Sequence, residues 1–223
     1  MPSNRRAVIF ANGLLGSLDD ARQALRPGDI LIAADGGARH CVSLGLVPHY
    51  LVGDFDSLDP HEQDELRQMG VAIYQHPARK DFTDLELALR HARALGADEI
   101  IVLGGLGARW DQTLANLLLP AAKEFASVHI RLLDGPQEVF LLREGESAEV
   151  RGSLGDTVSL IPLGGDAQDV TTDGLEYPLR GEALVFGATR GVSNVLLGET
   201  ASIRLERGLL LCVVIHHATP VEV

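Results

Sequence analysis

Short β-branched runs alternate with segments of helical periodicity from Ala7 to about Leu133. This alternation is typical of repeated β-α units, which form a largely parallel sheet with helices on its faces. The N-terminal part of the chain is therefore predicted to be an α/β domain. Its expected strands are Ala7–Ala11, Ile30–Ala34, Tyr50–Val52, Val71–Tyr74, Ile100–Leu103 and Val128–Leu133.

Two helices are predicted most clearly between these strands. In Thr83–Leu95 the apolar residues recur at the i, i+3, i+4, i+7 spacing of one helix face, and Thr83 with Glu86 has the pattern of a capping box. The second helix is expected from about Asp111 to Phe125, where Pro120 should bend it or limit its length.

The pattern changes after Asp134, where short strands separated by Gly, Asp and Pro turns replace the helical segments. We therefore predict an all-β, sandwich-like C-terminal domain over residues 136–223, following the α/β domain over residues 1–135. Its expected strands are Gln137–Leu142, Thr157–Ile161, Ala183–Phe186, Ser193–Leu197, Ala201–Glu206 and Leu209–Ile215.

Charge and composition exclude several classes of protein. The 19 Lys and Arg against 31 Asp and Glu give a formal net charge of −12, which repels nucleic acid and anionic membranes. The apolar run Leu209–Ile215 is too short to cross a bilayer, and no export signal is recognised at the start. Cys41 and Cys212 are far apart and lack zinc-ligand spacing, so we expect a reducing, cytoplasmic setting.

Acidic residues follow four of the predicted strands where each strand ends. Because ligands of open α/β sheets gather at the carboxyl ends of the strands, we expect these acids to share one edge. Asp54 and Asp56 are two residues apart, which suits a hard cation such as Mg²⁺. A solvated turn is the alternative, but so many uncompensated acids would repel one another unless a cation joined them. The acids are Asp35, Asp54, Asp56, Asp81, Asp84 and Asp111.

A glycine-rich stretch, Gly104–Gly107, leads through Arg109 into a predicted helix. Backbone N–H groups, a helix N-terminus and a guanidinium can together hold phosphate, although a flexible turn is the alternative. Neither the P-loop nor the dinucleotide fingerprint is present. Lys80 is either a further phosphate contact or a surface lysine, and Trp110 either packs on its helix or shields a nucleotide base.

Four motifs follow one another through the α/β half. They are Ala34-Asp35-Gly36-Gly37, Gly53-Asp54-Phe55-Asp56-Ser57-Leu58, Lys80-Asp81-Phe82-Thr83-Asp84 and Gly104-Gly105-Leu106-Gly107-Ala108-Arg109-Trp110-Asp111-Gln112. The β-rich half adds Ser159–Leu163, Val170–Leu175 and Gly191–Asn194. In this order they resemble the thiamine pyrophosphokinase (thiamin diphosphokinase) family over nearly the whole chain.

The resemblance implies transfer of the pyrophosphoryl group of ATP to the hydroxyl of thiamine, giving thiamine diphosphate and AMP with Mg²⁺. It implies a homodimer whose active sites lie between an ATP-binding catalytic domain, residues 1–135, and the partner's thiamine-binding domain, residues 136–223. It assigns catalytic roles to Asp54, Asp56, Asp84 and Asp111, of which the first three also bind metal. It assigns ATP binding to Asp35, Lys80, Asp81, Thr83, Gly104, Gly105, Gly107, Arg109 and Gln112. It assigns thiamine binding to Ser193, Asn194 and Thr172.

Two alternatives stay open at this point, because α/β sheets of this kind carry many functions. One is another Mg²⁺-dependent transferase or hydrolase of nucleotides or sugar phosphates, which would release different products. The other is a non-catalytic nucleotide-sensing dimer, which would bind ATP without turnover.

Overall fold

The computed structural model describes residues 5–107 and 109–217, and Ala108 of the glycine-rich motif lies outside them. The chain divides into two compact units, Met1–Gly135 and Pro136–Val223. Among the described residues, no helix combines the length and the apolar composition needed to cross a membrane.

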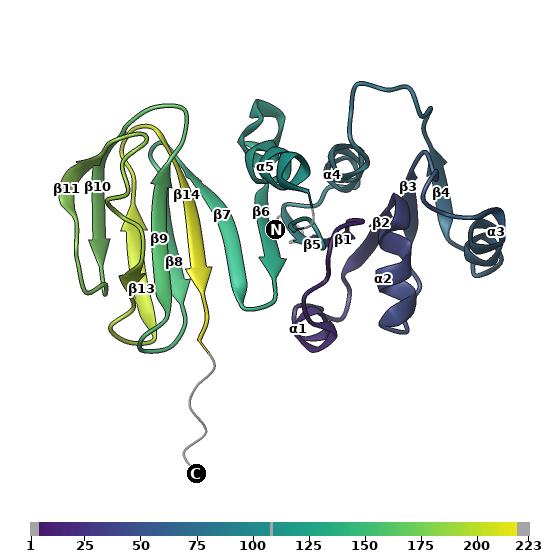
Figure 1. Cartoon of the computed structure of the whole chain (residues 1–223), viewed down its shortest axis with the longest axis horizontal. Coiled ribbons are helices and arrows are strands. Elements are labelled where there is room, and N and C mark those ends of the chain that lie inside the picture. The colour runs from purple at the N-terminus through teal and green to yellow at the C-terminus, as the bar shows by residue number, and fades with distance from the viewer. Residues whose placement is uncertain (1–4, 108, 218–223) are drawn as a thin grey trace, which may run out of the picture. The chain divides into compact units, whose positions relative to one another are not determined.

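The first unit is built on parallel strands in the order β6-β5-β1-β2-β3-β4 (Figure 1). Because β1 pairs with both β2 and β5, the chain changes the direction in which it adds strands beside β1. The carboxyl ends of strands at such a switch point are where α/β sheets bind ligands. The strands are β1 (Arg6–Phe10), β2 (Ile30–Ala34), β3 (Tyr50–Gly53), β4 (Ala72–Gln75), β5 (Glu99–Leu103) and β6 (His129–Asp134).

Helices cover both faces of this sheet. Every residue of β1 is buried, and its side chains alternate between the faces. Val8 and Phe10 belong to a core that includes Cys41 of α2 (Ala38–Ser43), whereas α4 (Asp84–Ala94) packs against β1, β2 and β3. In Figure 1, α2 and α4 lie on opposite sides of these strands. The remaining helices of the unit are α1 (Leu18–Gln23), α3 (Pro60–Gln68) and α5 (Trp110–Leu118).

The two helices predicted from sequence are present. The predicted capping box of α4 is only half formed. The hydroxyl of Thr83 accepts a hydrogen bond from Glu86 N, but the Glu86 carboxylate pairs with Arg90 at 2.8 Å. The second helix is shorter than predicted, because α5 ends at Leu118 and two short 3-10 turns, Leu119–Ala121 and Lys123–Phe125, continue the segment. Pro120 lies in the first of these turns, where it limits the helix as expected.

The second unit consists of antiparallel strands in two sheets around a buried apolar core. One group has the order β12-β9-β14-β7 and the other the order β11-β10-β13-β8. Val158, Val170, Leu184 and Cys212 are fully buried in the core between them. The strands are β7 (Gln137–Arg143), β8 (Ser147–Arg151), β9 (Thr157–Pro162), β10 (Ala167–Asp173), β11 (Arg180–Leu184), β12 (Asn194–Val195), β13 (Thr200–Arg204) and β14 (Leu209–Ile215).

Strand boundaries in this unit differ from the predictions. The strand expected at Ala183–Phe186 lies at Arg180–Leu184, and that expected at Ser193–Leu197 is only Asn194–Val195. The strands β8 and β10 were not predicted, because their alternating buried and exposed side chains include few large apolar residues.

Candidate active site

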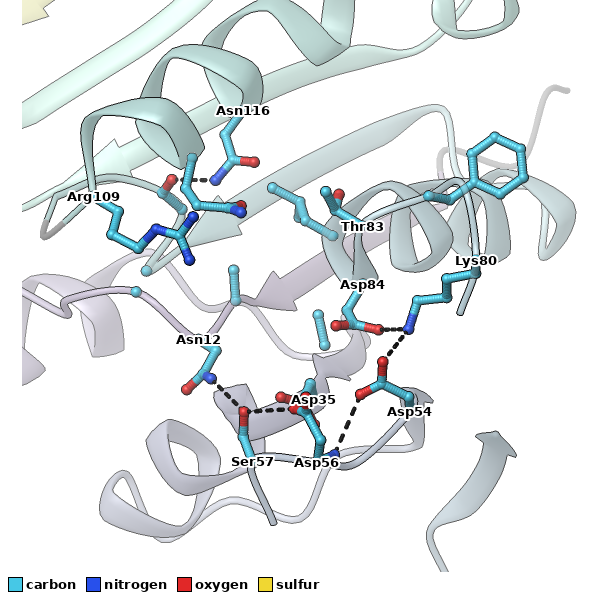
Figure 2. A pocket seen from close by; sticks show the side chains of 18 of the residues that line it. Asn12, Asp35, Asp54, Asp56, Ser57, Lys80, Thr83, Asp84, Arg109 and Asn116 are labelled. Carbon is cyan, nitrogen blue, oxygen red and sulfur yellow. Dashed lines mark hydrogen bonds and ion pairs between the residues drawn. The ribbon is translucent and has the colours of Figure 1, made fainter. Parts of the chain in front are cut away.

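A cavity of about 480 Å³ opens where β1, β2, β3 and β5 end (Figure 2). It brings together residues from all four motifs of the α/β half. Asp81 and Asp111, which the resemblance also assigns to the site, are not among the described residues that line it. The predicted residues that do line it are Asp35, Asp54, Asp56, Lys80, Thr83, Asp84, Gly104, Gly105, Gly107, Arg109 and Gln112.

Asp35 follows β2 directly and has a positive φ of 49°, a conformation that Asp tolerates better than most residues. It is only 4% exposed. It lies close to Gly53, where a Cβ would be 3.0 Å from Asp84 Oδ1 and 3.2 Å from Asp35 Cβ. With φ at 154°, Gly53 therefore permits both the backbone turn after β3 and the close approach of two carboxylates.

The loop after β3 orients Asp54 and Asp56. Phe55 lies between them with φ at 66°, and its ring is buried in the core on the α2 and α3 face of the sheet. The backbone N–H of Asp56 donates to Asp54 Oδ1 at 3.3 Å. Burial of Phe55 holds the loop in place, so Asp54 and Asp56 both line the cavity.

Carboxylate oxygens of Asp35, Asp54 and Asp56 lie within 4.8 Å of one another. Asp35 Oδ1 is buried and has no hydrogen-bond partner among the described residues. A buried acceptor without a partner costs free energy, and hard oxygen donors at this separation suit Mg²⁺ or Mn²⁺. These residues therefore fit a divalent cation. The metal set predicted from the resemblance had Asp84 where this group has Asp35.

Asp84 lies at the start of α4 and pairs with Lys80. The Lys80 ammonium donates to Asp54 Oδ2 at 2.8 Å and to Asp84 Oδ1 at 2.7 Å (Figure 2). The side chain of Lys80 is 11% exposed, so the interpretation of Lys80 as a solvated surface lysine is wrong.

The pKa values of the two carboxylates that pair with Lys80 are shifted in opposite directions. The hydrogen bond from Lys80 lowers the pKa of Asp54, whereas burial raises the pKa of Asp84 despite the same partner. Burial opposes the charge of Lys80 itself, but its two hydrogen bonds raise its pKa. The cavity therefore holds an ion-paired ammonium beside a group of carboxylates that carries excess negative charge.

The glycine-rich loop is held on two sides. Gly104 has φ at 67°, and a Cβ there would lie 2.7 Å from Ala11 O. Its carbonyl accepts a hydrogen bond from Gly13 N at 2.8 Å, and Asn116 Nδ2 donates to Gly105 O at 2.6 Å. Contacts with the loop after β1 and with α5 thus hold this backbone at the cavity, where a phosphate could be bound.

Arg109 is the residue before α5, and its guanidinium is exposed beside the cavity. Its Nε and Nη2 donate to Asp111 at 3.1 and 2.5 Å, and this pairing lowers the pKa of Asp111. Asp111 therefore orients Arg109. Trp110 is 87% exposed, so the interpretation of Trp110 as a packing residue within this chain is wrong.

Three polar residues that line the cavity had no role assigned from the sequence: Asn12, Ser57 and Asn116. Asn12 Nδ2 donates to Ser57 Oγ at 3.1 Å, and Ser57 Oγ donates to Asp56 Oδ1 at 3.3 Å. Asn12 comes just after the first strand, so the reasoning used for the acids could have found it. Asn116 is the one buried residue of α5, and a single polar residue within a helix is a weaker signal.

The residues predicted to bind thiamine lie in the second unit. The buried Asn194 amide accepts from Tyr177 N and donates to Tyr177 O, and the buried Thr172 hydroxyl accepts from Leu179 N. Both side chains therefore form hydrogen bonds with backbone groups of the second unit. Ser193 is exposed, with φ at 61°.

Both parts of the chain match models of known protein families. Residues 21–132 match the family model "Thiamin pyrophosphokinase, catalytic domain". Residues 146–210 match "Thiamin pyrophosphokinase, vitamin B1 binding domain". The first match alone spans half of the chain.

Curated relatives and solved structures agree with these matches. The chain is 29% identical to thiamine pyrophosphokinase of Bacillus subtilis over 92% of its own length and 96% of the relative. It is 28% identical to thiamine pyrophosphokinase 1 of Oryza sativa, over 80% of this chain and 76% of the relative. The crystal structure of the Bacillus subtilis enzyme superposes with a TM-score of 0.85 at 25% identity, covering 96% of this chain and all of that one.

Proposed function

Because the chain belongs to the thiamin pyrophosphokinase family, we propose that it transfers the pyrophosphoryl group of ATP to the hydroxyl of thiamine, giving thiamine diphosphate and AMP. In this reaction the thiamine oxygen forms a bond to the β-phosphorus, and the bond from that phosphorus to the oxygen shared with the α-phosphorus breaks. AMP carries away that bridging oxygen. The hydroxyl proton of thiamine is released to solvent, which balances the charges of the two products.

The observation that carries this proposal is the coincidence of two features in one cavity. Asp35, Asp54 and Asp56 form a group of hard oxygen donors with one unpaired buried oxygen. The glycine-rich loop and Arg109 line the same cavity. Phosphoryl and pyrophosphoryl transfer requires carboxylates that can bind a metal ion beside a loop that can bind phosphate.

Asp35, Asp54 and Asp56 would hold Mg²⁺, with Asp84 close enough to contribute when Lys80 moves. When bound, the cation would neutralise charge on the triphosphate and favour attack at phosphorus. Arg109 would bind phosphate oxygens through its planar guanidinium, and backbone N–H groups of Gly104–Gly107 would do the same. Thr83 and Gln112 would border the nucleotide.

The second unit, residues 136–223, would bind thiamine, as its family match suggests. Thiamine is a cation, so the negative charge of the chain would favour its approach. Among the predicted residues, Ser193 is exposed and would contact thiamine directly, whereas Asn194 and Thr172 would support the pocket through the backbone groups that they bond.

We further propose a homodimer and a cytoplasmic location. The dimer follows from the family resemblance, and light scattering after size-exclusion chromatography tests it. The location is supported by Cys41 and Cys212, which are both buried and unpaired.

Incubation of the chain with thiamine, ATP and Mg²⁺, followed by chromatography, tests the proposed reaction. We expect thiamine diphosphate and AMP in equal amounts, and no AMP without thiamine. Asp54→Asn should abolish both products while the circular dichroism spectrum is unchanged. ADP, inorganic phosphate alone or a glycoside would favour another transferase or hydrolase, and ATP binding without any product would favour a nucleotide sensor.

A further inference from the structure

The acids of the cavity form two groups that share one residue. Asp35, Asp54 and Asp56 have oxygens within 4.8 Å of one another, whereas Asp54 and Asp84 are bridged by the Lys80 ammonium. Asp54 belongs to both groups, because one of its oxygens lies within 4.8 Å of oxygens of Asp35 and Asp56, and its Oδ2 accepts from Lys80. The cavity therefore presents two cation positions side by side, and an ammonium fills one of them.

The two positions differ in how well their oxygens are satisfied. In the first, Asp35 Oδ1 is buried and has no hydrogen-bond partner among the described residues, so this position offers an oxygen that a cation could satisfy. In the second, Asp54 Oδ2 and Asp84 Oδ1 each hold Lys80 at under 3 Å, at 2.8 and 2.7 Å. A divalent cation would enter the second position only if the ammonium left it.

We infer that Lys80 is a built-in counter-ion that closes the Asp54–Asp84 position to a divalent cation until a polyphosphate is bound. The inference rests on the proposed triphosphate substrate. Lys80 lines the same cavity as Arg109 and the glycine loop, so phosphate oxygens would offer its ammonium new partners. Its flexible four-carbon stem allows that exchange without movement of the backbone.

This device would set the order of binding. The Asp35–Asp54–Asp56 position is open before the nucleotide arrives, and the second position opens as Lys80 turns to the phosphates. An enzyme without Lys80 would bind two divalent cations in the absence of nucleotide, because two adjacent unpaired carboxylates attract a replacement cation.

The inference is tested by titration with Mn²⁺ in the absence of nucleotide. The electron paramagnetic resonance signal of free Mn²⁺ measures how much of the ion stays unbound. We expect about one Mn²⁺ per chain for the natural sequence and about two for Lys80→Met. Adding Asp84→Asn to Lys80→Met should restore about one. Lys123→Met is the matched control, since Lys123 is the only other lysine and does not line the cavity; it should leave one.

Two Mn²⁺ bound by the natural chain, or an unchanged number in Lys80→Met, would overturn the inference. A measurement on the unsubstituted chain covers the case in which Lys80→Met fails to fold. With isotope-labelled lysine, nuclear magnetic resonance should show the ε-ammonium signal of Lys80 shifting when Mg²⁺ and tripolyphosphate are added, while that of Lys123 stays in place. An unshifted Lys80 signal, with tripolyphosphate binding verified by phosphorus resonance, would also overturn it.

These readouts need no transferase activity. If thiamine-dependent AMP fails to form but the Mn²⁺ numbers hold, the proposed function fails and the inference about Lys80 stands. If AMP forms but the Mn²⁺ numbers do not change in Lys80→Met, the inference alone fails.

Discussion

Replacing Asp35 by Asn should stabilise the chain without metal and remove its response to Mg²⁺. Asp35 is 4% exposed, and one of its carboxylate oxygens has no hydrogen-bond partner among the described residues. Asn has the same shape and tolerates the positive φ of 49° at this position, so the backbone should not change. Asp35→Asn therefore removes one charge from the carboxylate group and little else.

The magnitude follows from the spacing of the carboxylates. Two unit charges separated by the 4.8 Å limit of the group repel by about 3 kcal/mol at an effective dielectric constant of about 20, and by about 1 kcal/mol in bulk water. Lys80 already compensates part of the charge on Asp54. We therefore expect Asp35→Asn to raise the free energy of unfolding by about 1–3 kcal/mol in the presence of EDTA. Each kcal/mol should raise the thermal midpoint by about 2–4 °C.

Mg²⁺ should reverse the comparison. A cation at one hundred times its dissociation constant stabilises a folded chain by about 2.7 kcal/mol, and only the natural sequence should gain this. Thermal unfolding followed by circular dichroism, with EDTA and with Mg²⁺, measures both effects. Asp64→Asn is the matched control, because Asp64 is an exposed acid on α3 outside the cavity; it should change stability by no more than about 0.5 kcal/mol. If Asp35→Asn destabilises the chain in EDTA, or keeps the response to Mg²⁺, then Asp35 neither repels its neighbouring carboxylates nor binds the cation.

Four further predictions address the surroundings of the site. Arg109→Ala should raise the KM for ATP at least about tenfold and leave the thermal midpoint unchanged, because its guanidinium is exposed; steady-state kinetics would contradict this if KM stayed the same. Leu89→Ala, in the buried face of α4, should cost about 2–5 kcal/mol in urea denaturation, and a loss below 1 kcal/mol would count against the packing described. The hydrogen bond from Arg39 lowers the pKa of Glu62 from 4.5 to about 2, so its stabilisation is complete above about pH 5 and is lost as pH falls toward 2. The stability difference between the natural chain and Glu62→Gln should shrink over that range in acid unfolding, and a difference as large at pH 2 as at pH 5 would disprove it. Asn194→Ala should destabilise the second unit by about 1–3 kcal/mol, because it removes both hydrogen bonds between the buried Asn194 amide and the Tyr177 backbone; an unchanged urea midpoint would contradict this.

The α/β architecture could be predicted because parallel strands buried on both faces give strong local signals. Ile30–Ala34 matches its strand, and Thr83–Leu95 differs from α4 by one residue at each end. The order β6-β5-β1-β2-β3-β4 was not predictable, since it depends on pairings between segments far apart in the chain. In the second unit, Ser147–Arg151 was missed because its alternating side chains include one large apolar residue, Val150.

The acidic site could be predicted in outline because the carboxyl ends of parallel strands meet at one edge. Asp54 and Asp56 were expected to act together, and their oxygens lie in one group. That Asp35 joins this group while Asp84 pairs with Lys80 depends on the turn at Gly53 and on the reach of the lysine side chain. Those are tertiary features, and residue spacing carries no information about them.

Acids that follow separate strands would hold a divalent cation against a bound triphosphate. Crystals grown with Mn²⁺ and a non-hydrolysable ATP analogue would test this through the anomalous scattering of manganese. We expect a peak about 2.0–2.3 Å from oxygens of Asp35, Asp54 and Asp56 and from a phosphate oxygen of the analogue. A peak bound elsewhere, or manganese held by the nucleotide alone, would contradict it.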